Sequence, residues 1–280
     1  MKKWLIIAVC LMVVGLAVSL TALGLAGFDF MKLGTQNMKT KVYEPKERFW
    51  SIQMDVTTGD IAILPSPDGK VQVVCYEEEK VPFNATVEED TLVIRQQDQR
   101  KWYDHIGLHL QKPSVTVYLP AGQYGDLQIQ STTGDIRVTE DFLFQNADIA
   151  LTTGDVKWSS PVEMNLSVCC TTGDVEIADI TCGMLNIENR TGDVELERTQ
   201  AFEKLTVSLT TGDVELNRVD AGTISIIATT GDITCKLLTD KYFVADTTTG
   251  DVTVPVSGGG GQCYLKTTTG DIEAEIIGER

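Results

Sequence analysis

The chain has 280 residues, with 42% hydrophobic and 22% charged residues, as is usual for a folded globular protein. Its 40 Asp and Glu residues outnumber 23 Lys and Arg residues, which gives a formal net charge of −17. A surface this acidic repels nucleic acid and anionic lipid headgroups, so both are excluded as expected partners. Cations, neutral glycans and basic protein surfaces remain.

The amino-terminal segment is the first predicted element. After Lys2 and Lys3, residues 4–20 are almost uninterrupted apolar, and the apolar run continues more weakly to Gly27. About 20 apolar residues are enough to cross a bilayer as a helix. We therefore predict that residues 1–27 form a single transmembrane helix. A cleaved signal peptide, followed by secretion, is the alternative, because Gly24-Leu25-Ala26 offers small residues for cleavage.

The charges around this segment suggest how the chain is oriented. Lys2 and Lys3 favour a cytoplasmic amino terminus, and a large domain can be translocated whatever the charge of the residues that precede it. We predict a cell-membrane protein whose main domain lies outside the cytoplasm. Residues 28–44 are predicted to be the linker between the membrane and that domain.

Residues 45–125 are predicted to form an irregular first part of a β domain. One clear unit covers Met54–Ile63, and further strands are expected at Val71–Tyr76, Thr91–Ile94 and Val115–Leu119. Residues 98–110 do not fit the strand pattern and are predicted to be a loop.

A Thr-Gly-Asp repeat dominates the rest of the chain. From Gly134 onward the Gly-Asp pairs recur every 19 or 20 residues, and each follows a threonine. The glycines of the nine pairs are Gly59, Gly134, Gly154, Gly173, Gly192, Gly212, Gly231, Gly250 and Gly270. A motif repeated at one period indicates a repeat architecture.

The residues around each pair indicate two strands that meet at a corner. Each Asp is followed by Val or Ile, then by a mostly polar residue, then usually by another apolar one. This alternation is typical of a strand with one buried face. A second apolar alternation occupies the positions six and eight residues before each Asp. Its phase is shifted by one residue, which places a corner at Gly-Asp.

A unit of 19–20 residues with two strands is too short for a propeller blade of about 40 residues. It fits one coil of a parallel β-solenoid, in which equivalent strands of successive coils pair about 4.8 Å apart. We therefore predict an all-β fold: a regular parallel β-solenoid over residues 126–280, preceded by the irregular part and by one transmembrane helix.

These Thr-Thr-Gly-Asp-x-Val/Ile units behind a membrane segment resemble those of the bacterial putative-adhesin family, a domain of unknown function. The resemblance covers about residues 45–280. It implies a β-solenoid outside the cytoplasm and an association with cell-surface adhesion or envelope stress. The family brings no catalytic residues.

The repeated aspartates are the candidate metal ligands. Calcium would take their oxygens from a ladder formed by Asp135, Asp155, Asp174, Asp193, Asp213, Asp232, Asp251 and Asp271. The calcium-binding β-roll, however, has a nine-residue period and additional glycines. We favour a structural interpretation, in which the glycines adopt a positive φ and the aspartates accept nearby backbone hydrogen bonds, as in an Asx-turn. No metal or cofactor is expected.

The sequence favours a protein without enzymatic activity. Paired carboxylates could hydrolyse a polysaccharide, but here every coil carries the same aspartate, which indicates a scaffold. His105 and His109 are spaced for a helical metal site, yet no Glu follows His105 and Gly107 indicates a loop. The cysteines outside the apolar segment lack disulfide or zinc spacing and are expected to be buried thiols.

The predicted function is adhesin-like binding, or a structural role, at the bacterial envelope. The partner would be a protein, a cell-wall glycan or a second copy of the chain. The alternatives are an envelope-stress or signalling component and a polysaccharide-active enzyme. The last coil, Leu265–Ile277, keeps the full pattern with no cap after it. We therefore expect it to form the end of the rod and a site of self-association.

Overall fold

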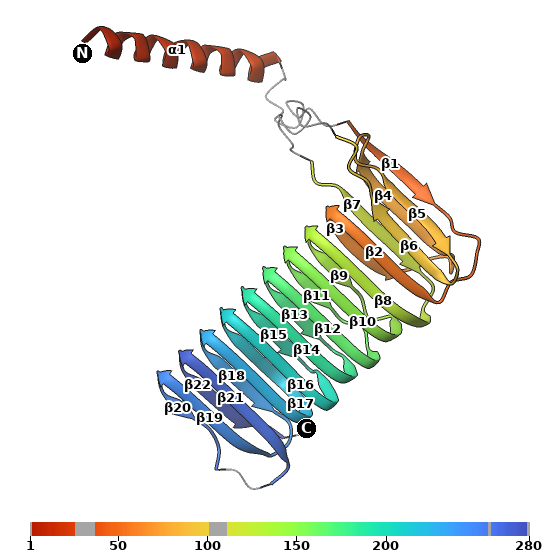
Figure 1. Cartoon of the computed structure of the whole chain (residues 1–280), viewed down its shortest axis with the longest axis vertical. Helices are drawn as coiled ribbons and strands as arrows, with labels where there is room; N and C mark the ends of the chain where they lie inside the picture. Colours follow the sequence, from red (N-terminus) through yellow and green to blue (C-terminus); the bar gives the residue numbers. More distant parts are fainter. Residues whose placement is uncertain (1, 26–36, 101–110, 257–258, 279–280) are drawn as a thin grey trace.

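The computed structural model describes residues 2–25, 37–100, 111–256 and 259–278. The β domain is a rod of stacked coils, and each coil contributes one strand to each of two sheets (Figure 1). The amino-terminal segment forms a helix, α1 (Lys2–Leu25). Among the described residues, no helix meets the length and hydropathy needed to cross a bilayer. The predicted transmembrane helix is therefore not confirmed.

One sheet, here called the long-strand sheet, contains the strands that precede the Gly-Asp corners. Its parallel strands are β2 (Ser51–Thr58), β8 (Gly122–Thr133), β10 (Phe142–Thr153), β12 (Val162–Thr172), β14 (Thr181–Thr191), β16 (Gln200–Thr211), the second part of β17 (Val214–Thr230), β19 (Lys241–Thr249) and β21 (Gly261–Thr269).

The other sheet, here called the short-strand sheet, contains the strands that follow the corners. Its parallel strands are β3 (Asp60–Pro65), β9 (Ile136–Val138), β11 (Val156–Trp158), β13 (Val175–Ala178), β15 (Val194–Glu197), the first part of β17, β18 (Ile233–Leu237), β20 (Val252–Thr253) and β22 (Ile272–Ile276). All neighbouring repeats pair in parallel, which confirms the solenoid.

The core lies between the two sheets. Apart from Val252, the Val or Ile that follows each Asp is at most 1% exposed, whereas Arg137, Lys157, Glu195 and Glu215 in the next column are exposed. The glycines of all nine pairs have φ between 125° and 143°. A side chain is rarely tolerated there, so glycine allows the change of phase at each corner.

Antiparallel strands cap the amino-terminal end of the rod. β6 (Thr91–Gln96) and β7 (Ser114–Leu119) extend the two sheets in parallel beyond β2 and β3. β5 (Phe83–Glu88) then pairs antiparallel with β6, and β4 (Gln72–Glu78) pairs antiparallel with β7. β1 (Met38–Tyr43) pairs antiparallel with β4. The β domain therefore includes residues that we had assigned to the 28–44 linker. Most of the predicted 98–110 loop lies outside the described residues.

The stacking order at the other end departs from the order of the sequence. β21 lies between β17 and β19, and β22 lies between β18 and β20. The coil that contains Leu265–Ile277 is therefore internal, and the prediction that it ends the rod is wrong. The coil made by β19 and β20 occupies the end instead. Every coil shows the same inward pattern, so that pattern cannot specify which coil stacks on which.

Candidate functional site

The repeated aspartates form a hydrogen-bonded ladder along the corner of the rod. In each step the Oδ1 atom of one aspartate accepts the backbone N–H of the aspartate in the next coil, as Asp193 does from Asp213 at 2.8 Å. The same bond, at 2.7–3.1 Å, links Asp60, Asp135, Asp155, Asp174, Asp193, Asp213, Asp232, Asp271 and Asp251. These bonds join neighbouring coils rather than closing a local turn, and they stabilise the stacked carboxylates.

A lysine compensates the charge at the first steps of the ladder. Lys112 Nζ lies 2.6 Å from Asp60 Oδ1 and 3.5 Å from Asp135 Oδ2. The hydrogen bond to Asp60 raises the pKa of Lys112 above its usual value. Within the described part of the chain, no group of three or more His, Cys, Asp or Glu side chains is placed to hold a metal ion. The Oδ1 atom of each carboxylate before the end coil thus has a structural role as the acceptor of a backbone N–H from the next coil.

We expect a chelator such as EDTA to leave the melting temperature of the protein unchanged. Each ladder carboxylate up to the end coil already accepts a backbone N–H, so calcium is not needed to join the coils. Thermal unfolding with and without EDTA, followed by circular dichroism, measures this. A clear drop in melting temperature with EDTA would show that the ladder binds calcium.

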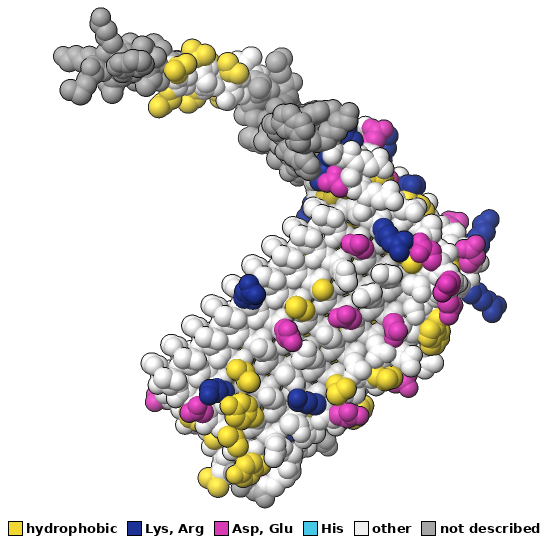
Figure 2. All heavy atoms as spheres, viewed as in Figure 1, with side chains coloured by type: hydrophobic (Ala, Val, Ile, Leu, Met, Phe, Trp, Pro, Cys, Tyr) yellow, Lys and Arg dark blue, Asp and Glu magenta, His cyan; other side chains and the backbone are white. Residues whose placement is uncertain are grey.

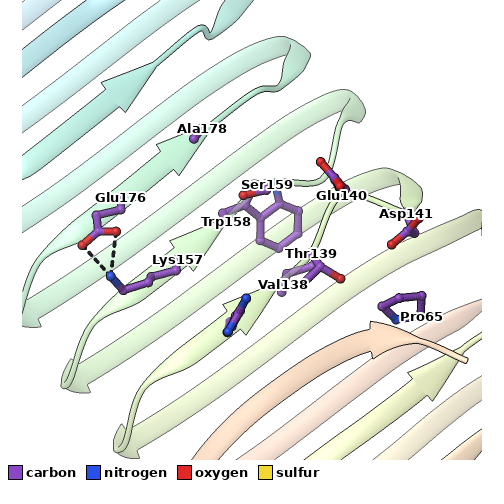
Figure 3. Close-up of a pocket in the computed structure, with 11 residues that line it drawn as sticks. Pro65, Val138, Thr139, Glu140, Asp141, Lys157, Trp158, Ser159, Glu176 and Ala178 are labelled. Atoms are coloured by element: carbon purple, nitrogen blue, oxygen red, sulfur yellow. Dashed lines mark hydrogen bonds and ion pairs between the residues drawn. The ribbon is translucent and has the colours of Figure 1, made fainter.

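A groove of about 670 Å³ interrupts the otherwise regular short-strand face. It lies beside β9, β11 and β13, where the chain leaves each strand, and Pro65 closes one side (Figure 3). Its volume is within the range of ligand-binding pockets in proteins. The side chains around it are Pro65, Arg137, Val138, Thr139, Glu140, Asp141, Lys157, Trp158, Ser159, Glu176 and Ala178.

Buried hydrogen bonds give the groove a rigid floor. Trp158 is 1% exposed, and its indole N–H donates to the carbonyl of Ser160. Ser160, itself fully buried, donates its hydroxyl to the carbonyl of Thr139 on the preceding coil. Trp158 also packs against Phe144 with ring centroids 5.7 Å apart. The indole ring thus fills the core under the groove and is not offered to a ligand.

Charged side chains of both signs surround this floor. Lys157 Nζ lies 2.7 Å from both carboxylate oxygens of Glu176, and this hydrogen bond raises the pKa of Lys157 (Figure 3). Arg137 is exposed and, among the described residues, makes no ion pair. Glu140 and Asp141 are exposed where the chain turns from β9 into β10. The Arg137 guanidinium is therefore available to a ligand, whereas the side chains of Lys157 and Glu176 hold each other in place on one side of the groove.

His105 and His109 lie outside the described residues. The repeat pattern predicts Arg137, Val138 and Trp158 only as members of the alternating columns after each Asp, and it does not indicate the groove. A signal was present, since Trp158 is the one aromatic residue in a column otherwise filled by smaller residues.

The described cysteines are free, and five of the six are buried. Burial raises the pKa of the Cys75, Cys182 and Cys263 thiols to about 12 and that of Cys170 to about 11. A raised pKa keeps a thiol protonated and unreactive at neutral pH.

Of these six cysteines, we expect only the exposed Cys169 to react with iodoacetamide in the folded protein. Peptide mass spectrometry would reveal modification of a buried cysteine, which would contradict this.

The fold and the aspartate ladder define the protein as a parallel β-solenoid of Thr-Gly-Asp coils. The sequence profile of the Toastrack DUF4097 family matches residues 49–279, so the chain belongs to that family. No protein with a curated description matches it significantly.

Several crystal structures resemble the chain. A putative lipid binding protein from Parabacteroides distasonis ATCC 8503 has a TM-score of 0.54 at 14% identity, covering 86% of this chain and 98% of its own. A putative adhesin from the same strain has a TM-score of 0.51 at 13% identity, with the same coverage. A putative adhesin from Bacteroides fragilis NCTC 9343 has a TM-score of 0.49 at 21% identity, covering 86% and 99%. At these identities the likeness to the two Parabacteroides distasonis structures shows the fold alone.

Proposed function

We propose that the chain is a non-enzymatic binding protein of the bacterial envelope, and that its solenoid holds a protein partner in the groove beside β9 and β11. The observation that carries this proposal is the groove itself, a concave site on a face that is built from repeated parallel strands. Solenoids commonly bind through their extended faces, and a local hollow gives such a face a specific point of attachment.

The chemistry of the groove favours a protein over a glycan. Sugars are commonly held by stacking on an exposed aromatic ring, but Trp158 is 1% exposed and its ring lies in the core. The groove instead offers the Arg137 guanidinium, the carboxylates of Glu140 and Asp141, and the hydroxyls of Thr139 and Ser159. A polypeptide with side chains of both charges and a polar backbone can satisfy this set of groups.

The aspartate ladder supports a role without catalysis. A catalytic carboxylate pair needs two groups in different environments, so that one is an acid and the other a base. The ladder carboxylates instead repeat one environment, since each accepts the backbone N–H of the next coil. The repeat therefore serves as a scaffold.

The β domain lies outside the cytoplasm in this proposal, and the apolar segment at residues 4–20 anchors it to the membrane. The apolar composition of that segment, and Lys2 and Lys3 before it, support this location. Protease added to intact cells, or to spheroplasts if an outer membrane shields the protein, should then digest the β domain. Digestion only after lysis of the inner membrane would contradict this location.

Site-specific photo-crosslinking in living cells tests the binding site. We would place a photoreactive amino acid at Ser159 or Ala178 in the groove, and at Glu215 on the same face two coils beyond Ala178. A specific adduct with another protein is expected from the groove positions and not from Glu215. It should be lost when Arg137 is changed to Glu. Equal adducts from all three positions, or none from the groove, would overturn the proposal.

A further inference from the structure

The coil made by β19 and β20 leaves two strand edges open at one end of the rod. β19 pairs with β21, and β20 pairs with β22. Neither has a second neighbour among the described strands. β19 is nine residues long, so it presents a long row of backbone N–H and C=O groups. Such an edge is a template for pairing with another strand.

Exposed apolar side chains lie on the strands of this end, with Tyr242 and Val244 on the outer face of β19 and Val252 in the inward column of β20. Tyr242 is 56% exposed, Val244 is 45% exposed and Val252 is 42% exposed, although residues equivalent to Val252 in other coils are buried. Val256, just beyond β20, is 99% exposed. Figure 2 shows hydrophobic side chains gathered at this end of the rod. We call this surface, formed by Tyr242, Val244, Val252 and Val256, the end patch.

The core is also incompletely covered there. Phe243, Ala245 and Val254 continue the inward columns of the solenoid, but they are only partly buried because no further coil lies over them. Cys263 and Leu265, which are the equivalents of Phe243 and Ala245 on the neighbouring coil, are at most 1% exposed. Covering this end of the rod would therefore bury Val252 and the open end of the core, and would place a strand directly beside Tyr242 and Val244.

The opposite end of the rod carries the usual protection against edge pairing. β1, an outer strand there, has exposed Lys39 and Lys41, and Lys39 forms an ion pair with Glu79 at 2.7 Å. β5, the other outer strand, carries Glu88, paired with Arg95 at 2.8 Å. Charges of this kind oppose strand addition. On β19, Lys241 is buried, and the one exposed charge is Asp246, which lies 3.6 Å from Lys266 of the neighbouring strand.

We propose that the end patch binds the end patch of a second copy of this chain. A twofold axis perpendicular to both sheets brings β19 antiparallel to β19 of the other copy and places the two open cores against each other. A twofold contact needs only one self-complementary surface, and antiparallel edges satisfy one another's hydrogen bonds. The end patch has few charges to repel its copy, despite the net charge of −17.

Two features favour a second copy over other occupants. A single peptide strand could pair with β19 but would leave Val252 and Val256 on the other side of the core exposed. The charged opposite end of a second copy is also a poor match, because it would place Lys39 and Lys41 against apolar side chains. The end of another identical solenoid covers both strands and the core between them.

The test compares edge variants of the full-length chain, purified in detergent. We expect analytical ultracentrifugation at up to about 100 μM to show a dimer for the wild type, since a micromolar Kd would populate it. Val244→Lys places a charge on the open edge and should remove the dimer. Val244→Thr keeps the preference for a strand and should weaken the dimer less. Thr40→Lys, on the already protected strand β1, is the matched control and should leave the dimer intact.

Crosslinking identifies the surface in contact. Val244→Cys, in a chain whose Cys169 and Cys10 are changed to Ser, should form a disulfide-linked dimer on oxidation, whereas Thr40→Cys in the same background should not. A wild type that stays monomeric would overturn the proposal. So would a dimer that survives Val244→Lys, since its contact must lie elsewhere. If the same oxidation in intact cells joined Val244→Cys to a different protein, that protein would replace the second copy and the proposal would be overturned.

Discussion

Replacing Gly212 by alanine is expected to destabilise the solenoid by about 2–4 kcal/mol, with the damage centred on the coils around residues 190–235. Gly212 has a φ of 135°, where residues other than glycine are strained. A Cβ atom there would also lie 2.2 Å from the carbonyl oxygen of Gly192 on the preceding coil. The coils would have to separate, which would stretch the Asp193–Asp213 hydrogen bond of 2.8 Å.

Gly122→Ala is the matched control for this substitution. Gly122 begins β8, has no positive φ, and no atom lies within 4 Å of where its Cβ would be. Gly212→Ala should unfold at a lower urea concentration than the wild type. The urea midpoint of Gly122→Ala should be almost unchanged. Hydrogen exchange should show the fastest new exchange near residue 212, because coils interact mainly with their neighbours. Unchanged exchange over residues 190–235 would contradict the role of the corner.

The repeat made most of the coil geometry predictable. Alternation after each Asp identified the buried column, and the one-residue change of phase located the corner at Gly-Asp. The expected strands at Val71–Tyr76, Thr91–Ile94 and Val115–Leu119 correspond to β4, β6 and β7. These predictions hold because burial of alternate side chains is a local property, which the sequence of a single coil expresses.

The order of the coils could not be predicted in the same way. The coil of β21 and β22 stacks between two coils that precede it in the sequence, and at the other end β2 and β3 lie between β6, β7 and β8, β9. Identical inward patterns make these arrangements equivalent in terms of burial. The order is set by a few side-chain contacts between distant residues, which no periodicity reveals. The groove is not predictable for a related reason, since its residues come from four coils.

One such contact is an ion pair between β19, in the end coil, and β17. Lys241, on β19, is 3% exposed, and its Nζ lies 2.6 Å from Asp220 Oδ1 on β17. β21 lies between these two strands, and its Gly261 is in register with Lys241. Because Gly261 has no side chain, Lys241 can reach across it. A Cβ on Gly261 would itself lie 1.9 Å from the carbonyl oxygen of Gly222.

The Lys241→Met substitution is therefore expected to destabilise the end coil by about 2–4 kcal/mol, because it leaves the Asp220 carboxylate, whose side chain is only 15% exposed, without its cation. Asp220 would keep the backbone N–H of Ala221 and the Thr239 hydroxyl as donors, at 2.8 and 3.0 Å, but neither carries a charge. Hydrogen exchange should accelerate over β19 to β22, and the coils before β16 should keep their protection.

Two further variants distinguish the effect of losing the Lys241–Asp220 ion pair from the effect of losing a long side chain. Lys266→Met removes an exposed pair with Asp246, whose side chains are 44% and 65% exposed, and should cost at most about 1 kcal/mol. Asp220→Asn added to Lys241→Met removes the unpaired charge and should recover part of the lost stability. If Lys241→Met behaved like Lys266→Met, the buried ion pair would not hold the order of the coils. The fit of Gly261 against Gly222 would then remain as the feature that places β21 between β17 and β19.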